Sequence, residues 1–111
     1  MLKVSVETFE SEVLQSPVPV VVDFFAPWCG PCRMLGPVLD RLAGDYQERL
    51  KFAQVNVDED PELANSFGVQ SVPTLLFVKD GEVVDFTVGL ADQASLVRRL
   101  NQLIGTQTAK V

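Results

Sequence analysis

The stretch that decides the fold is residues 20–32, Val20-Val21-Val22-Asp23-Phe24-Phe25-Ala26-Pro27-Trp28-Cys29-Gly30-Pro31-Cys32. It begins with a nearly continuous run of β-branched and aromatic residues, which is typical of a strand buried on both faces of a largely parallel sheet. It ends with two cysteines three positions apart, the only cysteines among 111 residues. A central strand therefore leads directly into a turn that carries both thiols.

The spacing of the two cysteines fits the start of a helix. Residues three apart lie on one helix face, so the sulfurs can meet, and the expected Cα separation of about 5 Å suits a disulfide. Pro31 fits the first helical turn, where its missing N–H is not needed. Cys29 then lies at the positive end of the helix dipole, which favours a thiolate. The pattern predicts a dithiol that closes and reopens, with one nucleophilic sulfur.

Three other interpretations of the pair are open. A structural zinc site needs four ligands, whereas the chain has no further cysteine and no histidine. A static disulfide across four residues would remove little entropy from the unfolded chain. In the third interpretation the two cysteines are inert and lie close together by chance. The sequence favours the redox interpretation, and no metal and no cofactor is expected in the domain.

Length and charge bound the class of protein. We expect a single domain over residues 1–111, with a core at about 4–105 and a loose tail at 106–111. The net charge of −6 argues against nucleic acid as a partner, because no basic run could release phosphate counterions. The acidic balance and the lack of an obvious apolar patch suggest a monomer.

The sequence also suggests where the protein works. No apolar run reaches the length of a membrane span, and the first residues show no secretory pattern. We therefore expect a cytoplasmic protein without a membrane partner. In such a reducing compartment a Cys-x-x-Cys pair is more often catalytic than structural.

Hydrophobic periodicity and turn residues give the order βαβαβαββα, an α/β sheet that is parallel-dominated and ends in a hairpin. Asp80-Gly81 is the hairpin signal, and Asp92 caps the last helix, which ends at Gly105. Thr8 or a neighbour caps the first helix. Strands are expected at 4–6, 18–26, 51–57, 74–78 and 82–88, and helices at about 8–14, 29–44, 62–67 and 93–105.

Several short motifs spread over the chain occur together in one known family. They are Asp23-Phe24, Ala26-Pro27-Trp28-Cys29-Gly30-Pro31-Cys32, Pro37, Val57-Asp58, Val72-Pro73-Thr74, Gly81 and Gly89. Through them the chain resembles the thioredoxin family over roughly residues 4–104. The resemblance implies the thioredoxin fold, a central mixed five-stranded β-sheet flanked by four helices.

The resemblance implies a general protein-disulfide reductase that maintains cell redox balance. Cys29, the exposed thiolate, attacks the disulfide of a target protein, and the more buried Cys32 resolves the mixed disulfide, leaving a Cys29–Cys32 disulfide. A separate thioredoxin reductase, NADPH-linked or ferredoxin-linked, returns the electrons. Cys32 must lose a proton before it attacks, and Asp23 is the candidate acceptor.

The surroundings of Asp23 support that role. Its apolar neighbours in the strand predict burial, which raises the pKa of a carboxyl group toward neutrality. Such a group suits proton transfer near pH 7. The alternative is a bulge or edge position that leaves Asp23 hydrated.

The family surface around the dithiol maps onto further residues. Pro73 resembles a cis-proline that leaves the backbone of Val72 free to pair with an extended substrate segment. Trp28 is expected to form a flat apolar rim, and Gly89 belongs either to this surface or simply to the end of a strand. Gly30, Pro31 and perhaps Met34 complete the predicted substrate surface.

Two residues depart from the family pattern. Gln54 stands where many thioredoxins carry a lysine, so it can hydrogen-bond Asp23 but brings no positive charge. Phe25 replaces a frequent tryptophan, which leaves Trp28 as the sole indole.

Two other functions stay open on this fold. One is a disulfide oxidase or isomerase, and the other is a binding module in which the cysteines are incidental.

Overall fold

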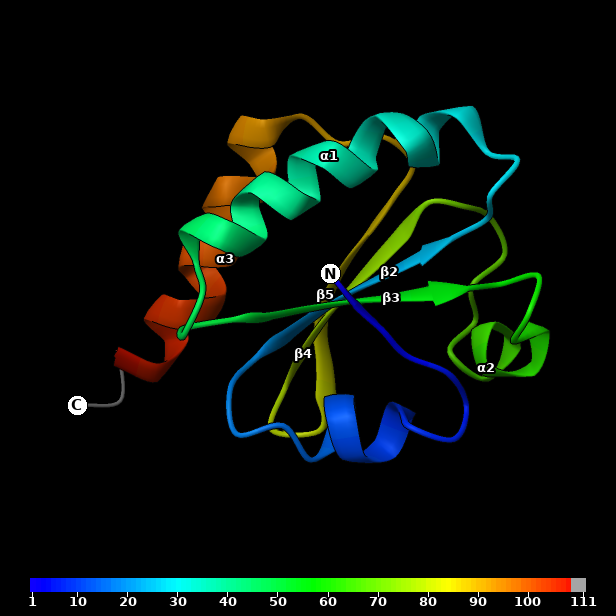
Figure 1. Cartoon of the computed structure of the whole chain (residues 1–111). Helices are drawn as coiled ribbons and strands as arrows, with labels where there is room; N and C mark the ends of the chain where they lie inside the picture. Colours follow the sequence, from blue (N-terminus) through cyan, green and yellow to red (C-terminus); the bar gives the residue numbers. More distant parts are fainter. Residues whose placement is uncertain (109–111) are drawn as a thin grey trace.

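The computed structural model describes residues 1–108, with side chains to residue 105. Its centre is the predicted mixed five-stranded sheet, and its strands lie in the order β1-β3-β2-β4-β5 (Figure 1). The first three strands in that order are parallel, whereas β4 is antiparallel to β2, and β5 is antiparallel to β4. The strands are β1 (Leu2–Lys3), β2 (Val20–Phe25), β3 (Lys51–Asn56), β4 (Thr74–Lys79) and β5 (Glu82–Val88).

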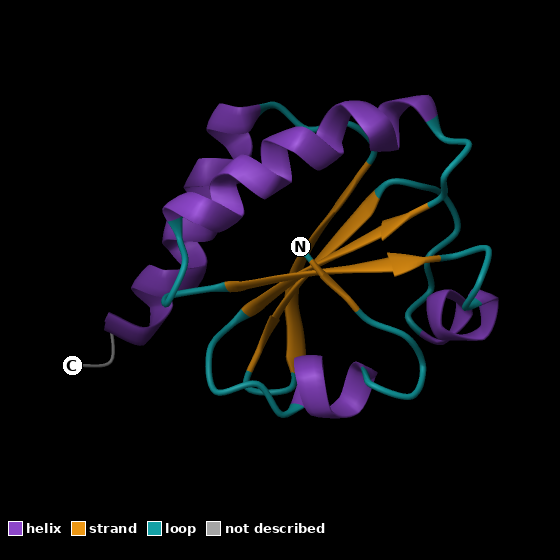
Figure 2. Cartoon of the chain, in the orientation of Figure 1, coloured by secondary structure: helices purple, strands orange, loops and turns teal. Residues whose placement is uncertain are grey.

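Helices cover both faces of the sheet (Figures 1 and 2). Helices α1 (Gly30–Asp45) and α3 (Gln93–Thr108) lie on one face, and α2 (Pro61–Ser66) and the short π-helix η1 (Glu10–Leu14) lie on the other. Each pair closes its own hydrophobic core. The predicted five-stranded sheet flanked by four helices is therefore confirmed.

Strand β2 lies in the middle of the sheet and supplies both cores. Val20, Val22 and Phe24 pack into the core beneath η1 and α2, whereas Val21 packs into the core beneath α1 and α3. Successive side chains of a strand point to opposite faces, so a strand covered on both sides must be apolar throughout. This explains the composition of residues 20–25 and makes Asp23 the exception.

The first strand was predicted at the wrong residues. It is β1 at Leu2–Lys3, not residues 4–6, and the chain turns away after the Val4 N–H donates to the Gln54 carbonyl oxygen. Thr8 does not cap the first helix through its own side chain. Its hydroxyl instead accepts a hydrogen bond from the backbone N–H of Ser5, which begins the turn.

The end of the chain confirms the turn chemistry and corrects a boundary. Asp80 and Gly81 both have positive φ, as expected for a two-residue hairpin turn. Asp92 accepts the Ser95 N–H at 2.8 Å and so begins α3 as predicted. The helix continues to Thr108, three residues past the predicted end at Gly105, because one glycine lowers helix propensity without forbidding helical dihedrals. Residues 109–111 of the predicted tail lie outside the described residues.

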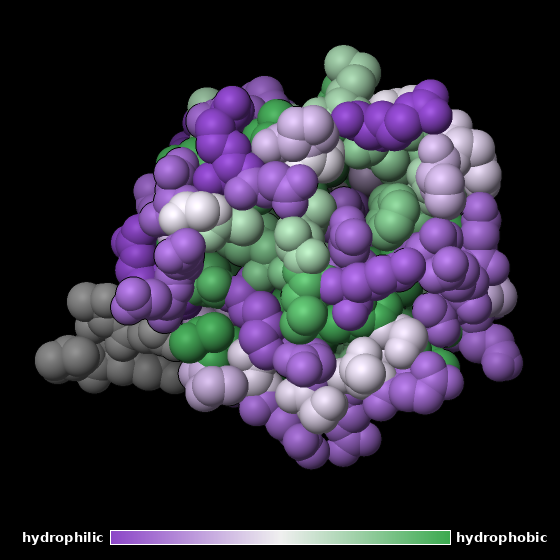
Figure 3. All heavy atoms as spheres, in the orientation of Figure 1, coloured by the Kyte–Doolittle hydropathy of each residue, from purple (hydrophilic) through white to green (hydrophobic). Residues whose placement is uncertain are grey.

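The surface is mainly polar in one view, but not throughout. Figure 3 shows hydrophilic side chains over much of one face, with hydrophobic residues gathered near its middle. The expectation of no apolar patch is wrong. Along β5 and just beyond it, five large apolar side chains are exposed: Val83, Val84, Phe86, Val88 and Leu90.

Within residues 1–108 no helix is both long enough and apolar enough to cross a membrane.

Candidate active site

Both cysteines lie at the carboxyl end of the central strand, where open α/β sheets place their sites. The chain leaves β2 at Phe25, and a turn with a Cys29 N–H bond to the Ala26 carbonyl oxygen leads into α1. Cys29 is the residue that caps α1, and Cys32 lies in its first turn. The two form a disulfide with Cα atoms 5.2 Å apart, as the spacing predicted.

Backbone geometry at the helix start favours negative charge on Cys29. The backbone N–H of Cys32 donates to the sulfur of Cys29 at 3.2 Å, so the sulfur fills the place of a capping oxygen. A thiolate there would gain this bond and the favourable end of the helix dipole. The sequence argument from helix position is therefore supported by a specific contact.

The predicted difference in exposure between the cysteines is wrong. Cys29 is 4% exposed and Cys32 is 5% exposed, so neither is open to solvent in the disulfide form. Val72 and Val57 pack against the pair from neighbouring loops and shield Cys29. What distinguishes the cysteines is their surroundings, because the Cys29 sulfur lies against the loop at Val72 and Cys32 lines a cavity that it shares with Asp23.

Asp23 is buried as the sequence predicted, with 2% of its surface exposed. It lies between Gln54 of β3 and Leu75 of β4 in the sheet register. Its Oδ1 atom has no hydrogen-bond partner among the described residues, so the possible bond from Gln54 does not satisfy that oxygen. Burial, with a smaller contribution from the carboxylate of Asp40, raises the pKa of Asp23 to about 7.

A solvent-open cavity of about 270 Å³ is lined by both Asp23 and the inner cysteine, Cys32. Arg33, Asp40 and Gln54 complete its polar wall. The cavity lies beneath α1, on the same face of the sheet as Asp23. The buried carboxyl group and Cys32 therefore border the same solvent-open cavity.

The loop before β4 meets the dithiol from the other side. The Val72–Pro73 peptide bond is cis, as predicted, and the Val72 carbonyl oxygen lies 3.7 Å from the Cys29 sulfur. Gly89 follows β5, has a φ of 88°, and donates its N–H to the Pro73 carbonyl oxygen at 2.8 Å. Gly89 therefore ends the strand and also lies beside the site, so the two interpretations of this residue do not conflict.

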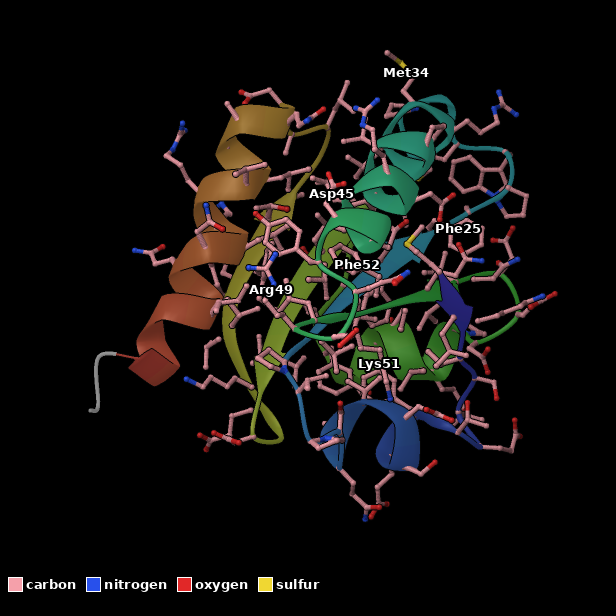
Figure 4. All side chains as sticks on the ribbon, turned by 60° about the vertical axis from the view of Figure 1, so that its left-hand side comes forward. Phe25, Met34, Asp45, Arg49, Lys51 and Phe52 are labelled. Carbon is pink, nitrogen blue, oxygen red and sulfur yellow. A yellow bond between two sulfur atoms is a disulfide. The ribbon has the colours of Figure 1, made fainter. Side chains whose placement is uncertain are left out.

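The remaining predicted surface residues surround the dithiol. Trp28 and Pro31 are exposed and Gly30 is half-buried. Figure 4 shows Met34 pointing outward from α1. The same figure labels Phe25, the last residue of β2. A groove of about 510 Å³ runs from Trp28 past Val72 toward α2. The sequence-predicted residues thus meet at one end of the molecule.

Comparisons with known proteins agree with this geometry. A family model described as Thioredoxin matches residues 1–102. The chain belongs to the thioredoxin family. It is 48% identical to Thioredoxin 1 of Synechococcus elongatus over 95 residues, which cover 86% of this chain and 89% of the relative.

Two further thioredoxins are similar over most of their length. Thioredoxin 1 of a Nostoc species is 47% identical over 100 residues, covering 90% of this chain and 94% of the relative. A Chlamydomonas reinhardtii protein named Thioredoxin M-type, chloroplastic, is 42% identical over 98 residues, covering 88% and 70%. The chain is accordingly a thiol–disulfide oxidoreductase that performs dithiol–disulfide exchange through Cys29 and Cys32. Thioredoxins act on disulfide-containing targets and are reduced by a reductase.

Sequence reasoning missed the parts that Asp58 and Asp40 play in this thioredoxin site. The Trp28 indole N–H donates to Asp58 at 3.0 Å, which holds the exposed ring in place. The signal was available, because Asp58 follows β3 just as Trp28 follows β2, and adjacent parallel strands end at one edge of a sheet. Asp40 gave no such signal, since only the packing of α1 brings it to the cavity of Asp23.

Proposed function

We propose that this thioredoxin is a general protein-disulfide reductase with distinct roles for its two sulfurs. The Cys29 thiolate attacks one sulfur of a target disulfide, which forms a mixed disulfide and releases the other target sulfur as a thiolate. Cys32 then attacks Cys29, closing their disulfide and releasing the second target thiolate. Two electrons pass to the target, and its two thiolates take up protons. The N–H contact to Cys29 supports its role as the nucleophile.

We propose that Asp23 accepts the proton of Cys32 before the second attack and returns it in the reverse reaction. Its placement with Cys32 on one cavity is the observation that carries this proposal. A carboxyl group with a pKa near 7 is substantially present in both protonation states at neutral pH, so it serves either direction.

The substrate surface is proposed from the same geometry. It would comprise Trp28, Gly30, Pro31, Val72, Pro73 and Gly89, supported by the Val72 carbonyl oxygen 3.7 Å from the Cys29 sulfur and by the Gly89 bond to Pro73. An extended target segment would pair with the backbone of Val72 and lie across the ring of Trp28. Such recognition of backbone and shape would accept many targets.

The reduction potential of the Cys29–Cys32 pair tests the direction of electron flow. Trp28 is the only tryptophan and directly precedes Cys29 in the chain, so its fluorescence should report the state of the pair in graded thiol buffers. We expect a potential more negative than that of the glutathione pool, which means that the protein gives electrons to targets. A potential well above that pool would instead indicate a disulfide oxidase.

Three finer properties complete the proposal. A thioredoxin reductase, either NADPH-linked or ferredoxin-linked, reduces the pair again, and an assay with each purified reductase would identify it. The protein is a cytoplasmic monomer. Its resemblance to cyanobacterial thioredoxins supports the cytoplasmic location, and cell fractionation would test it. Its net negative charge supports the monomeric state, and sedimentation would test that.

A further inference from the structure

The apolar side chains of β5 lie at the edge of the sheet, where no helix covers one face. Phe86 pairs in register with Leu76, and Val83 pairs with Val78. Leu76 and Val78 are buried in the core beneath η1 and α2, whereas Phe86 is 60% exposed and Val83 is 42% exposed. The helices on this face thus cover the inner strands and leave β5 open.

The opposite face of β5 is differently built. There Asp85 accepts two hydrogen bonds from the guanidinium of Arg99 on α3, at 2.6 and 2.7 Å, and Val84 lines the cavity beside that pair. Helix α3 therefore occupies this side of the strand. Phe86 and Val83 therefore lie on the face of β5 that no helix covers, whereas Val84 lies on the face toward α3.

A groove lies between the open face of β5 and the segment that precedes β4. It has a volume of about 360 Å³, and we call it the β5 groove, lined by Phe67, Val69, Ser71, Val83, Phe86 and Val88. Among the described residues that line it, none carries a charge. A chain that occupies it would therefore be uncharged and would bury apolar side chains.

The β5 groove continues the groove beside Trp28. Both are lined by residues 69–71, so they lie on the two sides of one short segment. The groove beside Trp28 includes Val72, whose carbonyl oxygen lies 3.7 Å from the Cys29 sulfur. The β5 groove also includes Val88, and the next residue, Gly89, donates a backbone hydrogen bond to the Pro73 carbonyl oxygen. Both grooves therefore border the point where disulfide exchange takes place.

We propose that the β5 groove binds the segment of a target protein that adjoins its reactive disulfide. This rests on the proposed reductase function. A target disulfide must reach Cys29, so the chain next to it has to cross the surrounding surface. An extended segment advances about 3.3 Å per residue. Because the two grooves share residues 69–71, such a segment continues past Ser71 into the β5 groove, where a large apolar side chain of the target lies against Phe86 and Val83.

Steady-state kinetics with matched peptides test the proposal. One disulfide-linked peptide carries leucines at two to six residues from its cysteine, and the other carries serines at the same positions. The variants are Phe86→Ser and Val83→Ser, with Val84→Ser as the control, because Val84 is 54% exposed on the same strand but faces α3. Oxidised glutathione, which is too small to reach the β5 groove, is the reference substrate.

We expect Phe86→Ser and Val83→Ser each to raise the KM for the leucine peptide about 5- to 20-fold, because a substantial apolar contact is lost. The KM for the serine peptide and for oxidised glutathione should stay within about twofold, and Val84→Ser should change none of the three. Equal kinetics for the two peptides with the unaltered protein would overturn the proposal.

Sedimentation of the same proteins separates a competing occupant. If the unaltered protein is a dimer that Phe86→Ser dissociates, a second copy fills the β5 groove and the proposal is wrong. Failure of the reductase function would look different, since the unaltered protein would then reduce neither oxidised glutathione nor either peptide.

Discussion

At the scale of single residues, the site depends on one buried carboxyl group in an otherwise apolar strand. Asp23 lies where Val20, Val21 and Val22 would predict another apolar side chain, and its Oδ1 atom lacks a partner among the described residues. Ionising such a group costs free energy because a buried carboxylate lacks the hydration that it would have in water. The fold retains the group at a cost in stability, which is expected where a residue serves chemistry.

The pH dependence of stability should reveal this cost. The pKa of Asp23 is about 7 in the folded protein and about 3.9 when unfolded, so its contribution is complete below pH 3.9 and is lost as the pH rises through 7. Asp23→Asn removes that loss. Relative to the unaltered protein, the variant should gain on the order of 4 kcal/mol between pH 4 and pH 8. Urea unfolding measures the free energy, and Asp45→Asn, at an exposed carboxyl group, is the control. If the free energy of unfolding changed with pH in the same way for Asp23→Asn and the unaltered protein, the raised pKa of Asp23 would be refuted.

Gln54 should decide how high Asp23 titrates. It lines the same cavity and carries no charge, whereas a lysine there would favour the carboxylate. We expect Gln54→Lys to lower the pKa of Asp23, measured by NMR titration of its carboxyl carbon. Gln47→Lys, at an exposed position outside the cavity, should leave it unchanged. An ordinary pKa for Asp23 in the unaltered protein would contradict both the prediction and the burial argument.

At the scale of elements, local chemistry decides where strands turn and helices begin. The hairpin between β4 and β5 needs two residues with positive φ, and Asp80 and Gly81 supply them. The start of α1 needs an acceptor for its free N–H groups, and the sulfur of Cys29 supplies it. The reactive atom is thus also the helix cap, which ties the chemistry of the pair to the geometry of α1.

Two glycines should respond oppositely to alanine. Gly81 has a φ of 80°, and an added Cβ would lie 3.1 Å from the Leu14 carbonyl oxygen, so Gly81→Ala should cost more than about 1 kcal/mol. Gly44 lies in α1 with open space around it, so Gly44→Ala should add about 0.5–1 kcal/mol. Thermal and urea unfolding measure both. A neutral Gly81→Ala would show that the hairpin turn adjusts without strain.

At the scale of the whole molecule, the exchange site contributes little to folding. The two large cores beneath α1 and α3 and beneath η1 and α2 are separate from the small cluster around the cysteines. The disulfide closes a loop of four residues, which limits its effect on the unfolded chain to about 2 kcal/mol. The fold is therefore a scaffold that stays intact while the dithiol opens and closes.

Cysteine variants should separate folding from exchange. Changing both Cys29 and Cys32 to serine should leave the circular dichroism spectrum unchanged and abolish disulfide reduction. Cys32→Ser alone should retain targets as mixed disulfides with Cys29, whereas Cys29→Ser should retain none, as mass spectrometry would show. Equal trapping by the two single variants would overturn the assignment of roles. A target that still binds the double variant as tightly would favour a binding module.

The sequence by itself determined the order of helices and strands along the chain, the exchange motif and the burial of Asp23, because each depends on local pattern: apolar runs, turn residues and a helix start. It misplaced the first strand, since an edge pairing of two residues depends on where β3 lies. Only the tertiary structure decided the equal burial of Cys29 and Cys32, the contact between Trp28 and Asp58, and the nearness of Asp40 to Asp23. These depend on how separate loops and α1 pack, which no local pattern encodes. The exposure of Phe86 has the same origin, because it follows from which strands the helices leave uncovered.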